Sequence, residues 1–173
     1  EQGHLDLDAP AETYCVELAS PQVLDGFDEA GQPILRDARS QVTLRNLLTH
    51  TSGYAYDFTD QNLAQWYTAT NTPGSLTRRL DSLKTPLMFD PGTQWLYGVG
   101  IDWAGLILER VTKTTLGDYF AEHLLEPLGM VDTGFTCTPN MLERKVALHL
   151  RTPDSSFMSF QTPPAENREF ESG

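Results

Sequence analysis

His50 and Ser52 are the first residues whose types suggest chemistry, and they lie in residues 47–53, which read LLTHTSG. An imidazole can act as a base for a hydroxyl nucleophile when the two groups are held within hydrogen-bond reach. Two positions in one tight turn cannot readily aim both groups at each other and at a substrate. We therefore favour a structural interpretation, in which HTSG is a turn that ends a helix and ties up backbone groups.

Glu122, His123 and Glu126 fall within one helical turn and resemble half of a metal site. The zinc-binding pattern H-E-x-x-H is absent, and no second cluster of ligands is evident. A solvated helix face is the favoured interpretation, and we expect no metal.

Residues 98–100, Gly-Val-Gly, could begin a dinucleotide-binding fingerprint if they join a strand to a helix. The next glycine of that fingerprint belongs at position 103, where Trp103 would block close approach of the ligand. We therefore set this interpretation aside. Asp102 is expected to be a favourable charge at the start of a helix rather than a catalytic acid.

Three segments in a fixed order carry a resemblance: residues 47–53, residues 91–97 (PGTQWLY) and residues 126–133 (EPLGMVDT). Together they resemble the serine β-lactamase-related group, which includes class C β-lactamases, penicillin-binding proteins, carboxypeptidases, esterases and acyltransferases. The match covers roughly residues 1–150, and residues 101–105 and 144–151 are most similar to fungal members. The resemblance implies an α/β fold of the β-lactamase/transpeptidase type and an acyl-enzyme mechanism that requires no cofactor.

Chemistry in that family starts from a serine on an S-x-x-K helix, where the lysine helps to remove the hydroxyl proton. No serine here has a lysine three positions later, and Ser82 and Lys84 are two apart. The family places that helix just before the segment matching residues 1–8, and its K-T-G or H-x-G strand lies near its C-terminus. We therefore expect residues 1–173 to be a partial domain with the nucleophile upstream and the closing strand downstream.

The resemblance implies a catalytic role for Tyr97, which matches the tyrosine of the family's Y-x-N motif. A phenol is a poor base at its ordinary pKa of about 10, but a nearby lysine ammonium favours the phenolate and makes proton transfer feasible. Residue type alone would favour a core aromatic beside Trp95. Val99 stands at the asparagine position and cannot donate an amide hydrogen bond, which favours esters or acyl transfer over β-lactams. Trp95 and Val99 are the candidate substrate-binding residues.

The sequence is thus interpreted as the central part of a serine hydrolase or acyltransferase for small-molecule ester, amide or acyl substrates. By itself the chain is expected to be inactive. The alternative is a non-catalytic binding or structural module that keeps the same scaffold.

Composition narrows the range of partners. The chain carries 24 acidic and 12 basic residues, for a net charge of −12, which would repel nucleic acid. Its longest apolar stretches, such as residues 103–108, are far short of the ~20 residues that span a bilayer. Cys15 and Cys137 are not in a C-x-x-C pair, and we expect both to be buried thiols rather than a disulfide.

The elements that must position these residues are mostly helical. Thr43 is predicted to cap a short helix over residues 44–48, and Asp60 to cap a second helix. Ser75 is predicted to begin a third helix, which ends before Pro86. Residues 90–93 (DPGT) predict a type II turn, because Pro91 and Gly92 occupy its central positions.

That turn should deliver residues 94–97 in extended form, with Tyr97 at the mouth of a central helix enclosed by protein. An amphipathic helix is expected from Leu116 to Leu124. Residues 23–36 suit a surface loop or small hairpin, and residues 141–151 an extended or helical return. Residues 152–173 are predicted to be loop, and no run of successive alternating strands is evident. A mainly helical segment without a sheet is what the central part of a larger α/β protein would look like.

Overall fold

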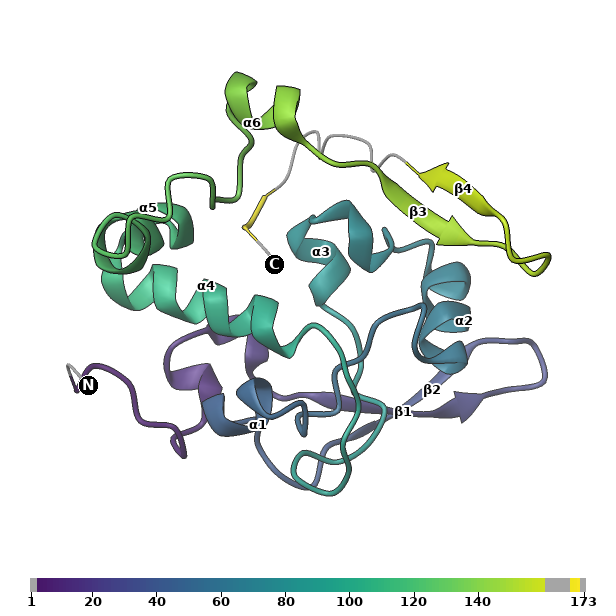
Figure 1. Ribbon diagram of the computed structural model, residues 1–173. Coiled ribbons are helices and arrows are strands. Elements are labelled where there is room, and N and C mark those ends of the chain that lie inside the picture. The colour runs from purple at the N-terminus through teal and green to yellow at the C-terminus, as the bar shows by residue number, and fades with distance from the viewer. Residues whose placement is uncertain (1–2, 161–168, 172–173) are drawn as a thin grey trace.

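The computed structural model describes residues 3–160 and 169–171 (Figure 1). Their elements, in chain order, are the 3-10 turns η1 (Ala11–Thr13) and η2 (Val16–Leu18), strands β1 (Gln22–Phe27) and β2 (Pro33–Asp37), helices α1 (Leu44–Leu48) and α2 (Gln61–Thr70), the 3-10 turn η3 (Ser75–Thr77), helices α3 (Leu80–Leu83), α4 (Gly100–Thr112) and α5 (Leu116–Phe120), the π-helical turn η4 (Ala121–Leu125), helix α6 (Pro139–Arg144), and strands β3 (Leu148–Arg151) and β4 (Phe157–Phe160).

Helices α1 and α2 begin where their capping residues predict. Thr43 Oγ1 accepts a hydrogen bond from the Asn46 N–H at 3.2 Å, and the Asn46 side chain accepts the Thr43 N–H at 3.1 Å. Asp60 Oδ1 accepts the N–H groups of Asn62 and Leu63 at 2.9 and 3.0 Å. Both caps satisfy amide donors that the first helical turn leaves without partners.

The single helix predicted from Ser75 is wrong. The chain forms η3, passes through Arg78 in the left-handed region with φ of 54°, and then starts the separate helix α3. Ser75 lies inside η3 instead of capping it, and its hydroxyl donates to Asp57 at 2.6 Å. A left-handed residue cannot continue a right-handed helix, so the segment divides at Arg78.

Strands occur only as two antiparallel hairpins in the part of the chain that the structure describes. The predicted hairpin over residues 23–36 is confirmed as β1 and β2, which a bridge between Val23 and Leu87 joins to the rest of the fold. Residues 141–151 form most of α6 and all of β3. The prediction of loop from residue 152 onward is wrong for β4, which pairs with β3; residues 161–168 and 172–173 of that prediction lie outside the described ones.

Helix α4 is the centre of the core (Figure 1). Trp103 and Ile107 have no exposed surface, and Ile101 is the one exposed residue of the helix, which confirms the expectation of an enclosed helix. Helix α1 packs directly on α4 through Leu44 and Leu47. Gly100 permits this contact, because a Cβ there would lie 2.5 Å from the Leu47 carbonyl oxygen.

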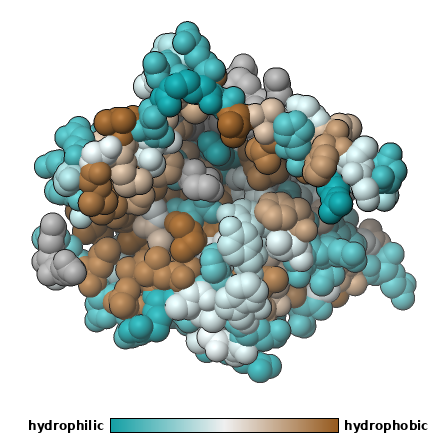
Figure 2. Space-filling model, in the orientation of Figure 1, coloured by the Kyte–Doolittle hydropathy of each residue, from teal (hydrophilic) through white to brown (hydrophobic). Residues whose placement is uncertain are grey.

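The segment from α5 onward is far less buried than α4. Leu116 begins a helix as predicted, with Thr115 as its cap, but the π-helical turn η4 finishes it. From residue 121 to residue 159 no described residue is buried. Val131 and Val146 are 87% and 85% exposed. Figure 2 shows hydrophobic residues, in brown, at the surface among hydrophilic ones. Among the described residues, no helix is both long enough and apolar enough to cross a membrane.

Candidate active site

Tyr97 stands at the end of the extended segment 94–97, directly before α4. The turn that precedes this segment has the predicted geometry: Gly92 has φ of 85°, and the Thr93 N–H donates to the Asp90 carbonyl at 3.2 Å. A positive φ at the third turn position is what a type II turn requires, and glycine adopts it without steric cost.

Asp90 fixes the start of this turn. Its carboxylate accepts two hydrogen bonds from the Arg36 guanidinium, at 2.9 and 3.0 Å, and one from the Arg39 N–H at 2.8 Å. These bonds, the Arg36 pair first, lower the pKa of Asp90 to about 2. The turn is thereby attached to β2 and to the loop that follows it.

Residues 50–53 run beside residues 88–96 and are joined to them by backbone hydrogen bonds. Met88 donates to the Gly53 carbonyl at 2.8 Å, Gly92 to that of Thr51 at 2.8 Å, and Leu96 to that of His50 at 2.9 Å. We call this pairing the loop ladder. It places His50 beside Tyr97 although the two lie far apart in the sequence.

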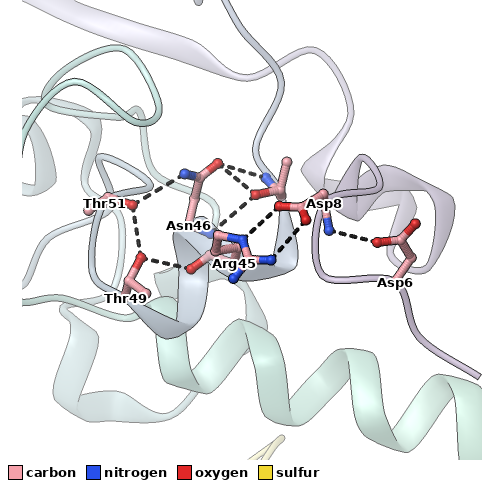
Figure 3. Close-up of polar contacts among 7 residues, drawn as sticks. Asp6, Asp8, Arg45, Asn46, Thr49 and Thr51 are labelled. Carbon is pink, nitrogen blue, oxygen red and sulfur yellow. Dashed lines mark hydrogen bonds and ion pairs between the residues drawn. The ribbon is translucent and has the colours of Figure 1, made fainter. Parts of the chain in front are cut away.

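Side chains at the end of α1 hold the loop side of this ladder (Figure 3). Asn46 Nδ2 donates to Thr51 Oγ1 at 3.2 Å, and the Thr49 hydroxyl lies 3.0 Å from that of Thr51 and donates to the Arg45 carbonyl at 2.8 Å. The Arg45 guanidinium in turn makes a two-pronged ion pair with Asp8, at 2.7 and 2.8 Å. The loop is therefore connected to the N-terminal segment as well as to α1.

His50 and Ser52 have separate partners. The His50 ring centroid lies 4.8 Å from that of Tyr97, and its Nδ1 accepts the Gly98 N–H at 3.5 Å. Ser52 is 1% exposed, and its hydroxyl accepts the Tyr54 N–H at 3.4 Å. This arrangement agrees with the interpretation of HTSG as a turn that ties up backbone groups.

The three predicted site residues differ in exposure. Tyr97 is 48% exposed, so it is not a core aromatic, and Trp95 is 66% exposed with its ring 6.2 Å from that of His50. Val99 is 1% exposed and belongs to the core around α4. Tyr97 and Val99 both line a cavity of about 170 Å³, whereas Trp95 is not part of its lining.

Tyr56 also lines this cavity, although no motif in the sequence pointed to it. Its hydroxyl donates to Asp102 Oδ2 at 3.0 Å, and its ring lies 5.4 Å from that of Tyr97. Burial, and then the Asp102 charge, raises the pKa of Tyr56 well above its usual range. Asp102 lies in the first turn of α4 as expected, but it is buried and has a phenol donor rather than solvent. No local pattern joins residues 46 positions apart, which is why the pair was missed.

The remaining candidate groups do not form sites. Among the described residues, no three His, Cys, Asp or Glu side chains gather in a way that could hold a metal ion. Ser82 is buried and donates to the Arg79 carbonyl at 2.6 Å, whereas Lys84 pairs with Asp81 at 2.9 Å. The serine and the lysine are therefore not a nucleophile and its base.

Both cysteines are free thiols, as expected, but the expectation that both are buried is wrong for Cys137, which is exposed. Cys15 is buried beside Arg110, whose guanidinium lies 2.6 Å from its sulfur. Burial raises the pKa of the Cys15 thiol to about 11 and outweighs the opposite effect of Arg110. The difference follows from position, because Cys137 precedes α6 in the exposed part of the chain.

The model of the family described as Beta-lactamase matches residues 1–166. Monacolin J acid methylbutanoyltransferase from Aspergillus terreus is 38% identical over 148 residues, which are 84% of this chain and 36% of that protein. Lovastatin esterase from Penicillium rubens is 39% identical over 137 residues, or 78% of this chain and 34% of the esterase. The chain thus spans about a third of the length of these relatives.

Solved structures agree with the sequence comparison. A mutant simvastatin synthase from Aspergillus terreus superposes with a TM-score of 0.81 at 40% identity, over 92% of this chain and 39% of that one. A penicillin-binding protein from Bacillus halodurans gives a TM-score of 0.57 at 23% identity, over 91% and 44% of the two chains, and shows a likeness of fold alone. The predicted β-lactamase/transpeptidase-like fold is confirmed.

Proposed function

The chain belongs to the Beta-lactamase family, and from this premise we propose that it is part of a serine hydrolase or acyltransferase. The enzyme would form an acyl-enzyme from a small-molecule ester, amide or other acyl donor and pass the acyl group to water or to another acceptor. Residues 1–173 would be one part of its catalytic domain, with the nucleophilic serine on an S-x-x-K helix supplied by another part. The names of the fungal relatives, a methylbutanoyltransferase and an esterase, support this substrate class.

The observation that carries the proposal is the placement of Tyr97. Its phenol is half exposed at the rim of the cavity, while its backbone is held by the loop ladder and by the Thr59 hydroxyl, which donates to the Tyr97 carbonyl at 3.3 Å. A side chain that can reach a ligand from a fixed backbone is suited to proton transfer, because acid–base catalysis depends on geometry before it depends on pKa.

In the proposed reaction the serine oxygen attacks the acyl carbonyl, and its proton passes to the Tyr97 oxygen, which must be a phenolate to accept it. Tyr97 then returns the proton to the leaving group as the acyl-enzyme forms. In the second step it takes a proton from the incoming water or other acceptor and returns it to the serine. The buried Val99 would offer an apolar wall rather than an amide donor, which suits an alkyl acyl chain. Trp95 would contact the substrate from outside the cavity.

The test begins by sequencing the gene upstream of the codon for residue 1 and looking for an encoded S-x-x-K motif. The longer protein is then expressed. Tyr97→Phe should lower its single-turnover acylation rate with an activated ester by about 10²–10⁴-fold, with substrate binding little changed. Tyr119→Phe is the matched control and should acylate at the parental rate. Acylation of Tyr97→Phe at the parental rate would contradict the proposal, and absence of S-x-x-K would favour the non-catalytic scaffold.

A further inference from the structure

His50 contacts the chain on both sides of Tyr97. Its carbonyl oxygen accepts the Leu96 N–H at 2.9 Å, and its Nδ1 accepts the Gly98 N–H at 3.5 Å. Its ring also lies against that of Tyr97, with centroids 4.8 Å apart and planes at 49°. One residue therefore supplies a main-chain contact before the phenol, a side-chain contact after it, and a surface for the ring itself.

The backbone of His50 is set in an unusual conformation to do this. Its φ is 56°, in the left-handed region that few non-glycine residues adopt. The hydrogen bonds on either side maintain it: the Thr49 hydroxyl is bound to the Arg45 carbonyl, and the Thr51 N–H donates to the Asn46 carbonyl at 2.9 Å. Local strain persists only where surrounding contacts over-determine it, and such positions cluster at functional sites.

We propose that His50 is a positioning residue for Tyr97, an inference that rests on the proposed function of Tyr97. Because Nδ1 accepts a hydrogen bond from the backbone, the neutral ring carries its proton on Nε2. Through its carbonyl oxygen and its Nδ1, His50 fixes the backbone of residues 96–98, so that the Tyr97 oxygen is aimed before substrate arrives. Misplacement of a reacting group by about 1 Å can cost about 100-fold in rate, so such a contact has kinetic consequences.

The test compares two substitutions in the longer active protein. Asparagine tolerates the left-handed conformation, and its Oδ1 stands at the same number of bonds from the backbone as Nδ1, so His50→Asn keeps the acceptor. Glycine tolerates the conformation equally but has no acceptor. Both variants lose the ring, so their difference reports on the acceptor. His149→Asn, on the exposed strand β3, is the control for replacing a histidine.

We expect His50→Gly to lower the acylation rate constant by about 10-fold with the ester dissociation constant unchanged, and His50→Asn to stay within about threefold of the parent. His50→Ala is a second acceptor-free variant, and because alanine is strained at this φ, its rate is compared only after a thermal melt shows that it is folded. Rates are divided by the concentration of active sites from titration, so loss of folded protein does not count as loss of rate. Equal losses in His50→Asn and the acceptor-free variants, or no loss in either, would overturn the proposal.

A double substitution separates this proposal from the one on which it rests. If His50 acts through Tyr97, His50→Gly should change the rate by less than about twofold in a Tyr97→Phe background. The same 10-fold loss in that background would show that His50 does not act through Tyr97 and would overturn the inference alone. A Tyr97→Phe variant at the parental rate would instead refute the proposed function.

Discussion

The Arg36 guanidinium meets the Asp90 carboxylate edge to edge, at 2.9 and 3.0 Å, across 54 positions of sequence. The pKa of Asp90 is about 2 in the fold against an ordinary value of 3.8, so the ionised carboxylate stabilises the fold above pH 4, and this stability is lost as the pH falls from 3.8 towards 2. Asp90→Asn should lower the melting temperature at pH 7, and the gap between variant and parent should close by pH 2. A gap that stays constant from pH 7 to pH 2 would show that the charge of Asp90 is not the stabilising feature.

Gly98 has no room for a side chain. A Cβ at this position would overlap the Tyr54 carbonyl oxygen and the Ala55 backbone. Both are main-chain atoms, which cannot move away by a change of side-chain rotamer. Gly98→Ala should therefore destabilise the longer protein by about 1–3 kcal/mol in urea titrations. Gly134→Ala is the control, because the nearest atom to its added Cβ lies at 3.9 Å, and its stability should change by less than about 0.5 kcal/mol. Equal stability of the two variants would count against the close approach.

The 173-residue chain alone should not hydrolyse p-nitrophenyl acetate faster than its own Tyr97→Phe variant. Its residues include a candidate proton carrier but no serine with a lysine three positions later. The measurement is the release of p-nitrophenol, with the longer protein as positive control. A Tyr97-dependent rate in the short chain would mean that another nucleophile is at work.

The two cysteines should differ in reactivity. Cys15 is buried with its pKa raised to about 11, whereas Cys137 is exposed. Because the thiolate is the reacting species, iodoacetamide at pH 8 should label Cys137 about 100-fold faster than Cys15, as followed by mass spectrometry of the two peptides. Labelling in urea should remove the difference. Similar native rates would indicate that Cys15 is reachable and ionised, contrary to its burial.

Features encoded within a few residues were predictable from the sequence. Thr43 and Asp60 predict the starts of their helices, because a cap and its amide partners lie within three positions of each other. Pro91 and Gly92 together specify a turn without any distant contact. Ser75 is not a cap because its hydroxyl donates to the distant Asp57, and the predicted helix divides because Arg78 is left-handed. The prediction of loop was wrong for β4 because these residues form a strand by pairing with β3, and their own sequence shows no strand pattern.

In the candidate site, too, local features were predictable and long-range contacts were not. Tyr97 was proposed through the resemblance of its motif, and its place at the start of α4 followed from the turn, whereas its 48% exposure did not. Its neighbours His50 and Tyr56 could not be assigned from sequence, because they reach it through the loop ladder and through packing. Val99 was chosen for its place in a motif, and its burial depends on contacts between α1 and α4 that no single segment specifies.

The loop ladder has a consequence for how this surface can change. Its three hydrogen bonds join main-chain atoms, so none of them depends on which side chain a residue carries. The side chains of Gln94 and Trp95 are exposed, and none of the three bonds depends on them. Under the proposed role of Tyr97, mutational libraries at these two positions should alter substrate preference while the Tyr97 backbone stays in place.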